Sequence, residues 1–245
     1  MPPSRDTDVG VVLLHGAMLG RWIWERVEPR LGAPALAVDF PGRGEKPADI
    51  TTLKLGDVVD SVVADIEAWP TPRIVLVAHS LAGIVAPGVI ARLRQRVVRT
   101  VFVSAAVPLA GASYRDSLPG SQRLMLRFAL LTQKKGLLSP AWATKRALCN
   151  DLDEPTTQLV IDNLTREAPG MYTSPVGEFP DAMPTTYVRL TSDRGLPPAV
   201  QDKMIARLHH TRLHEIDTGH LPMLGHPDRL ARLLDAVVDG SGNES

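Results

Sequence analysis

This sequence has little cysteine, few aromatic residues and no excess of either charge. Cys149 is the one cysteine among 245 residues, which excludes an intramolecular disulfide. Aromatic residues make up 4%, and 27 basic side chains balance 27 acidic ones, with no basic stripe. This composition argues against nucleic acid or an anionic membrane as the partner and favours a small-molecule ligand.

The sequence predicts neither a secretory signal nor a membrane span. The chain starts with polar residues, whereas a secretory signal needs an apolar segment there. The most apolar window, residues 74–91, contains His79, Ser80 and Pro87, which fits a buried strand and helix better than a membrane span. We therefore expect a cytoplasmic protein.

Motifs that bind nucleotides are also lacking. Residues 41–47 contain two glycines and two prolines, but neither the Lys-Ser/Thr pair of a P-loop nor G-x-G-x-x-G spacing. Cys149 has no base nearby in the sequence, which favours a packing role over a reactive thiol. The sequence therefore predicts neither a cofactor nor a metal.

What is present is a regular alternation of short apolar runs and amphipathic segments. Continuous apolar runs are typical of parallel strands covered on both faces, and residues 53–69 have the period of an amphipathic helix. The pattern predicts one α/β domain with a mostly parallel sheet of about six strands flanked by helices. The expected strands lie at residues 9–14, 34–40, 73–79, 97–107, 185–190 and 213–216.

The alternation is interrupted between residues 108 and 184. Helical pieces at 122–132, 140–149 and 156–166 occur there without a strong strand. Because loops this long are uncommon without a function, we expect a helical cap at 108–184 on a core made of 1–107 and 185–245. Apolar side chains of the cap, including Leu126, Phe128 and Trp142, are expected to line a substrate pocket.

Ser80 lies where an apolar strand runs into a helix. A nucleophile at such a turn has a strained backbone, and the positions two before and two after it must be small. Here both are alanine, Ala78 and Ala82, instead of glycine. A serine that only caps the next helix is the alternative interpretation. Pro87 is expected to kink or end that helix.

Two further polar residues follow predicted strands, Asp193 and His220. The carboxyl ends of parallel strands meet at one edge of the sheet, where such sheets bind ligands. The order Ser80, Asp193, His220 suits a nucleophile, an acid that orients the imidazole, and a base. Asp217 is a rival acid, but it lies only three residues before His220.

Backbone amides near the first strand and after Ser80 are candidates for an oxyanion hole. Gly16 ends the first strand and allows close approach, so the Ala17 amide could pair with that of Leu81. An ordinary strand-to-helix turn is the alternative. Trp22, which has helical spacing with its neighbours, is either a core residue or part of a pocket.

At these residues the chain resembles the α/β-hydrolase superfamily. Residues 191–204 and 219–224 resemble its plant methylesterase and hydroxynitrile lyase branch. The resemblance implies an α/β-hydrolase fold, Asp193 as the triad acid, His220 as the base and Ala17 as an oxyanion donor. The departures are the alanine pair around Ser80 and a Pro-Gly-Arg-Gly loop more typical of bacterial hydrolases.

The resemblance favours a serine carboxylesterase that cleaves small to medium hydrophobic esters through an acyl-enzyme, without metal or cofactor. The alternative is a non-hydrolytic protein of the same fold: a cyclase, a hydroxynitrile lyase or a ligand receptor. In the lyases a threonine stands at the position of Gly16 and a lysine at the position of Leu221. Gly16 and Leu221 are therefore expected to lie at the substrate. The sequence leaves the oligomeric state open, a homodimer included.

Overall fold

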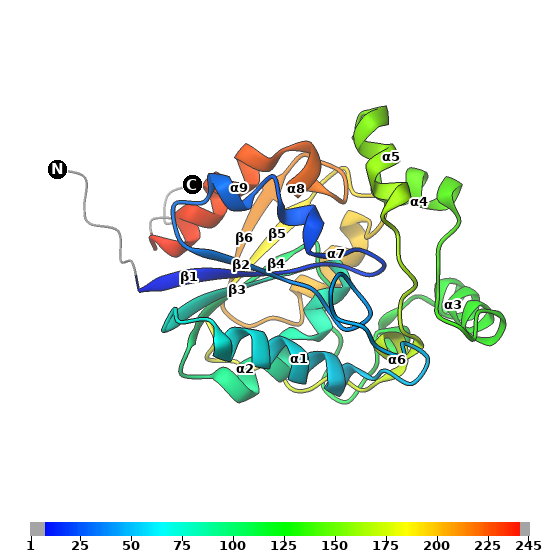
Figure 1. The fold of residues 1–245 in the computed structure, drawn as a ribbon, viewed down its shortest axis with the longest axis horizontal. Helices are drawn as coiled ribbons and strands as arrows, with labels where there is room; N and C mark the ends of the chain where they lie inside the picture. The colour runs from blue at the N-terminus through cyan, green and yellow to red at the C-terminus, as the bar shows by residue number, and fades with distance from the viewer. Residues whose placement is uncertain (1–7, 241–245) are drawn as a thin grey trace.

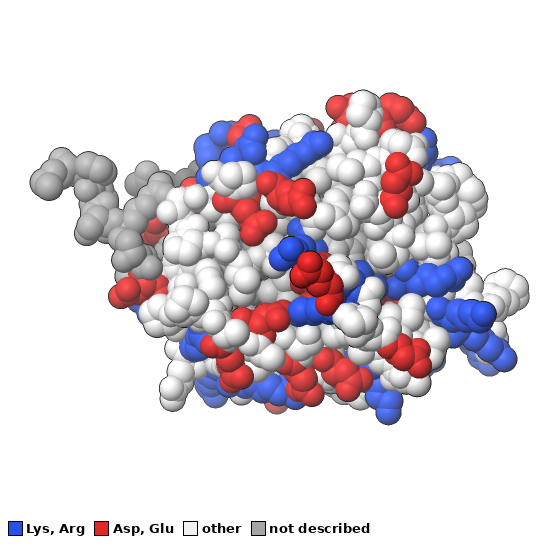
Figure 2. Space-filling model, in the orientation of Figure 1, with Lys and Arg blue, Asp and Glu red and all other residues white. Residues whose placement is uncertain are grey.

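The computed structural model describes residues 8–240. The polar start of the chain, on which the expectation of a cytoplasmic protein depends, lies outside these residues. Within them, no helix has both the length and the apolar character needed to cross a membrane. Acidic and basic side chains are interspersed over the face shown in Figure 2.

The predicted parallel sheet is confirmed. Its six strands run in the order β2-β1-β3-β4-β5-β6, and every neighbouring pair is parallel. All carboxyl ends therefore lie at one edge, on the right in Figure 1. The strands are β1 (Val9–Leu14), β2 (Ala35–Val38), β3 (Arg73–His79), β4 (Val97–Val103), β5 (Thr185–Leu190) and β6 (Thr211–Ile216).

Helices cover both faces of the sheet, which explains its nearly continuous apolar strands. Alternate side chains of β1 enter two separate cores: Val12 and Leu14 join one cluster, and Val11 and Leu13 join the other. The first is covered by α1 (Leu55–Ala68) and α2 (Ala86–Leu93), and α7 (Pro198–Ile205) contributes Met204 to it. The second is covered by η1 (Arg21–Trp24), α8 (Pro222–Gly225) and α9 (Pro227–Val238), and η2 (Glu28–Arg30) lies between Val27 and Leu31, which join or contact it.

Several details differ from the sequence prediction, and two of them have a clear physical reason. The strand expected to reach residue 107 ends at Val103, because Ser104 has a left-handed backbone (φ 41°) and turns the chain. The helix after Ser80 is not kinked at Pro87; a 3-10 turn, η3 (Ser80–Ile84), precedes α2. Pro87 lies in the first turn of α2, where a missing amide hydrogen costs no helical hydrogen bond.

Between β4 and β5 the chain is helical. This segment lies beyond the carboxyl ends of the strands (Figure 1) and includes one helix that the sequence pattern did not indicate, α6. Cys149 is buried at the end of α4, and burial raises the pKa of its thiol to about 11, consistent with packing. The elements are η4 (Arg115–Ser117), α3 (Gly120–Thr132), α4 (Ala141–Leu148), α5 (Glu154–Asp162) and α6 (Pro169–Thr173).

Gly83, three residues after Ser80, packs tightly against the backbone of Ala106. A Cβ on Gly83 would lie 2.1 Å from the carbonyl oxygen of Ala106, so Gly83→Ala must push the turn and the β4 end apart. We expect a loss of about 1–3 kcal/mol in the free energy of unfolding, measured by urea denaturation. The control is Gly56→Ala in α1, where a Cβ meets nothing within 4 Å and helix propensity favours alanine. Equal urea midpoints for Gly83→Ala and Gly56→Ala would contradict the prediction that a methyl group at position 83 collides with Ala106.

Candidate active site

Ser80 has a left-handed backbone at the end of β3. Its φ of 54° is rare for a residue with a side chain, and its carbonyl accepts a hydrogen bond from the Ala106 amide (2.9 Å). Ala78 and Ala82 are fully buried, whereas the position that admits no methyl is Gly83. In the G-x-S-x-G pattern the second glycine stands at the position of Ala82. Here the glycine that meets a neighbouring backbone, the carbonyl of Ala106, is Gly83, one residue later, so the turn accommodates the alanine pair.

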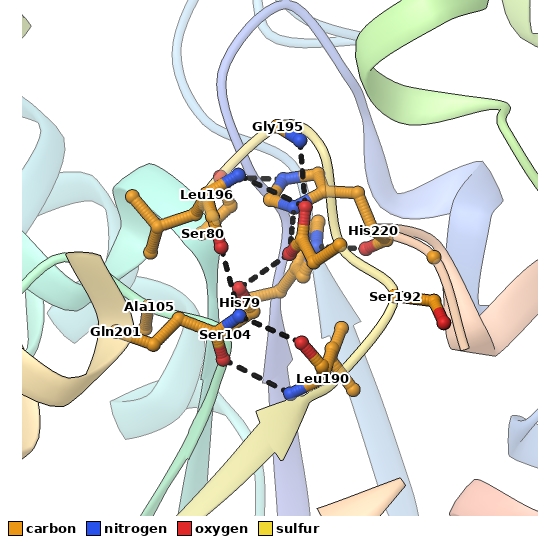
Figure 3. Close-up of polar contacts among 12 residues, drawn as sticks. His79, Ser80, Ser104, Ala105, Leu190, Ser192, Gly195, Leu196, Gln201 and His220 are labelled. Carbon is orange, nitrogen blue, oxygen red and sulfur yellow. Dashed lines mark hydrogen bonds and ion pairs between the residues drawn. The ribbon is translucent and has the colours of Figure 1, made fainter. Parts of the chain in front are cut away.

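The structure brings Ser80, Asp193 and His220 together at the carboxyl edge of the sheet, and Figure 3 shows Ser80 and His220 there. His220 Nε2 lies 2.9 Å from Ser80 Oγ, and His220 Nδ1 lies 2.7 Å from Asp193 Oδ2. A hydrogen on Nδ1 satisfies Asp193 and leaves Nε2 free to accept the serine hydroxyl proton. Asp217 lies apart from this group and accepts the hydroxyls of Thr191 and Ser192.

The Asp193 carboxylate is buried and fully hydrogen-bonded. Its Oδ1 accepts the amides of Gly195 (2.7 Å) and Leu196 (2.9 Å), and its Oδ2 also accepts the Ser104 hydroxyl (2.6 Å). Burial raises the pKa of Asp193, but attraction to His220 and these hydrogen bonds outweigh it, so the pKa lies below its ordinary value. Asp193 is therefore ionised at neutral pH.

The loop that carries Asp193 is fixed from behind by a buried glutamine. Gln201 on α7 accepts the Leu190 amide and donates to the carbonyls of Leu190 and Leu196 (2.8–2.9 Å; Figure 3). Sequence reasoning found neither Gln201 nor Ser104. Ser104 is a polar residue within an expected apolar strand, and this position could have marked it as a candidate site residue.

Two other histidines are buried and neutral. Burial, the largest cause, lowers the pKa of both His15 and His79 to about 3. His79 Nε2 donates to the carbonyl of His220 (2.9 Å), and Nδ1 of His15 donates to the carbonyl of Gly16 (2.8 Å). His15 thereby holds the peptide group whose N–H belongs to Ala17.

Of the proposed oxyanion donors, Leu81 directly follows Ser80, and Ala17 follows Gly16, which lies close to Ser80. The amide of Leu81 lies in the first turn of η3, where a helical partner is lacking. Among residues 8–240, the Ala17 amide has no acceptor within hydrogen-bonding distance. A Cβ on Gly16 would lie 2.9 Å from Ser80 Cβ and 3.0 Å from His79 Nδ1, so glycine lets this loop reach the serine.

The expected pocket residues are scattered. Leu126 is half-buried against the first core cluster, whereas Phe128 and Trp142 point outward with 68% and 72% exposure. Leu221 is fully buried in the second cluster. Trp22 is half-buried beside a surface hollow of about 280 Å³.

The loops that carry Asp193 and His220 are also tied to the insertion. Asn150 Nδ2 donates to the carbonyl of Ser192 (3.0 Å), and the Asp151 carboxylate accepts the amide of Gly219 (2.5 Å). Sequence reasoning missed both residues, because nothing local marks a contact across this distance along the chain. In the described part of the chain, no three His, Cys, Asp or Glu side chains are grouped to hold a metal ion.

Comparisons with known proteins agree with this architecture. Methylesterase 17 of Arabidopsis thaliana is 23% identical over 96% of this chain and 92% of its own. The pimeloyl-[acyl-carrier protein] methyl ester esterase of Xanthomonas campestris is 29% identical over 93% and 94%. An extracellular alpha/beta-hydrolase from a Paenibacillus species superposes with a TM-score of 0.85 at 18% identity, covering 94% of this chain and 98% of that one.

The resemblance to the plant methylesterase branch is confirmed by these relatives. A model described as the alpha/beta hydrolase family matches residues 11–233. The match takes in the sheet from residue 11 of β1 onward and the residues at its carboxyl edge. The chain belongs to the alpha/beta hydrolase family.

Proposed function

We propose that this protein is a carboxylesterase that uses Ser80 as nucleophile, His220 as base and Asp193 as the group that orients His220. The observation that carries the proposal is the continuous hydrogen-bonded path from Ser80 Oγ through the imidazole to a buried carboxylate. The relatives named as methyl ester esterases support esters of a small alcohol as substrates.

Acylation follows from the positions of these groups. His220 Nε2 takes the hydroxyl proton as Ser80 Oγ attacks the ester carbonyl, and Asp193 stabilises the resulting imidazolium. The amides of Ala17 and Leu81 bind the oxyanion of the tetrahedral intermediate. His220 then returns the proton to the alkoxide oxygen, so the C–O bond breaks and the alcohol leaves.

Deacylation repeats these steps with water. His220 takes a proton from water, whose oxygen attacks the acyl-enzyme, and the same amides bind the second oxyanion. Collapse of this intermediate breaks the bond to Ser80 Oγ, which recovers its proton from His220. Residues 108–184 act as the cap over this site.

Hydrolysis is favoured over cyanohydrin cleavage by residues 16 and 221. A side chain at position 16 would collide with Ser80 and His79, so the threonine of the lyases does not fit this loop. Leu221 is buried in an apolar core and offers no charge to a departing cyanide ion. The chain thus lacks both groups that the lyases direct at substrate.

The first test concerns the nucleophile. A serine-directed phosphonate should label Ser80 covalently, and Ser80→Ala should lower kcat by roughly 10⁴- to 10⁶-fold. The unfolding midpoint should barely change. The matched control is Ser121→Ala on α3, where the serine is exposed and away from the triad. Retention of more than about a tenth of the activity by Ser80→Ala would refute the assignment.

The second test separates the two reaction types. We expect turnover of p-nitrophenyl acetate or butyrate and no cyanide release from mandelonitrile above background, because Leu221 offers no charge to a leaving cyanide. Colorimetric assays measure both. Cyanide release that Ser80→Ala abolishes, with no ester turnover by the wild type, would replace the esterase proposal with the lyase.

The third test is the pH dependence of kcat/KM. His15 and His79, with pKa values of about 3, stay neutral above pH 5, and the lowered pKa of Asp193 keeps it charged. None of these three groups should therefore take up a proton on the acid side of the profile above pH 5. A plot of log(kcat/KM) should approach a slope of one on its acid side. A slope of two would require another titrating group.

A further inference from the structure

The backbone of Met18, directly after Ala17, is held from both sides by the helical insertion. Its amide donates to Glu167 Oε2 (2.9 Å), and its carbonyl accepts the amide of Thr165 (3.0 Å). Met18 is left-handed, with φ of 60°, a conformation that costs a residue with a side chain about 1–2 kcal/mol. These two hydrogen bonds compensate that cost at the loop that carries a proposed oxyanion donor.

Glu167 also forms a buried ion pair with Arg43. Arg43 Nη2 lies 2.9 Å from Glu167 Oε2, and the two side chains are only 2% and 4% exposed. Arg43 Nε donates to the carbonyl of Leu19 (2.9 Å), while Glu167 Oε1 accepts the amide of Ala168 (3.0 Å). The pair thus joins the loop after β1, the loop after β2 and the insertion.

The Glu167 backbone is itself fixed. It exchanges two hydrogen bonds with Leu137, at 2.8 and 2.7 Å, in an isolated antiparallel bridge. A buried charge with three donors on its carboxylate has little freedom to move, since any displacement leaves a donor or the charge unpaired. Glu167 therefore presents its Oε2 to Met18 from a rigid position.

We propose that Glu167 is a positioning residue for the oxyanion hole, a role that rests on the proposed esterase function. The Met18 N–H and the Ala17 carbonyl belong to one peptide group, so anchoring Met18 sets the rotation of the chain about Ala17. His15 holds the preceding peptide group through the Gly16 carbonyl. Together these contacts set the direction of the Ala17 N–H, and the ion pair with Arg43 keeps Glu167 in place.

The first experiment compares Glu167→Gln with a matched change elsewhere in the cap. We expect kcat to fall about 10- to 100-fold, because a donor is misaimed rather than removed, while KM changes less than about threefold. A trifluoromethyl ketone, whose adduct with Ser80 carries an oxyanion, should lose affinity in parallel, unlike its methyl ketone counterpart. The control is Glu154→Gln, which breaks only the exposed ion pair with Lys145.

The second experiment separates positioning from simple stability. Replacing one partner of the buried pair strands a charge, whereas Arg43→Met combined with Glu167→Leu removes both charges. The double variant should recover the unfolding midpoint lost by either single variant and should not recover kcat. Recovery of kcat with the midpoint would overturn the inference, since Glu167 would then serve Arg43 alone.

The third measurement does not depend on catalysis. Hydrogen exchange at the Met18 amide, followed by NMR, should accelerate in Glu167→Gln and stay unchanged in Glu154→Gln. If the wild type hydrolyses no ester while this difference is seen, the proposed function fails and the anchor of Met18 stands. If exchange is unchanged in Glu167→Gln, the inference fails whatever the enzyme hydrolyses.

Discussion

The buried carboxylate of Asp193 is the constraint on which the geometry of the site depends. An ionised group shielded from water must have its acceptor positions filled, or folding incurs a large desolvation cost. Its donors are the Ser104 hydroxyl after β4, the amides of Gly195 and Leu196 after β5, and the His220 ring after β6. Satisfying this one charge therefore fixes three strand ends relative to each other. The alignment of His220 with Ser80 follows from that fixation.

Backbone strain at the same edge has a similar explanation. Met18, Ser80 and Ser104 are all left-handed, and each follows a strand of the sheet. None could keep this conformation without contacts that compensate it. The Ser80 carbonyl accepts the Ala106 amide, and the Ser104 amide donates to the Val188 carbonyl. Neighbouring strand ends thus stabilise each other, which orients the reactive groups before any substrate arrives.

The sequence predicts correctly the features that depend on residues close together along the chain. Continuous apolar runs predict strands buried on both faces, and polar residues after three of them predict the Ser80, Asp193 and His220 group. It fails where a contact spans distant segments: Glu167 lies far from Met18 along the chain, and no period links them. It also cannot tell which side of an apolar helix packs: on α3, Leu126 contacts the first core cluster whereas Phe128 is exposed.

Side chains of the insertion contact the loops of the proposed catalytic residues at three points. Asn150 binds the residue before Asp193, Asp151 binds the residue before His220, and Glu167 binds the residue after Ala17. Each contact is a hydrogen bond to backbone, so it depends on the position of the insertion and not on the side chain that it meets. On the proposed mechanism, a shift of the insertion would misalign acid, base and oxyanion donor at once. On the same mechanism, residues 150, 151 and 167 act on catalysis through the backbone of the loops that they hold.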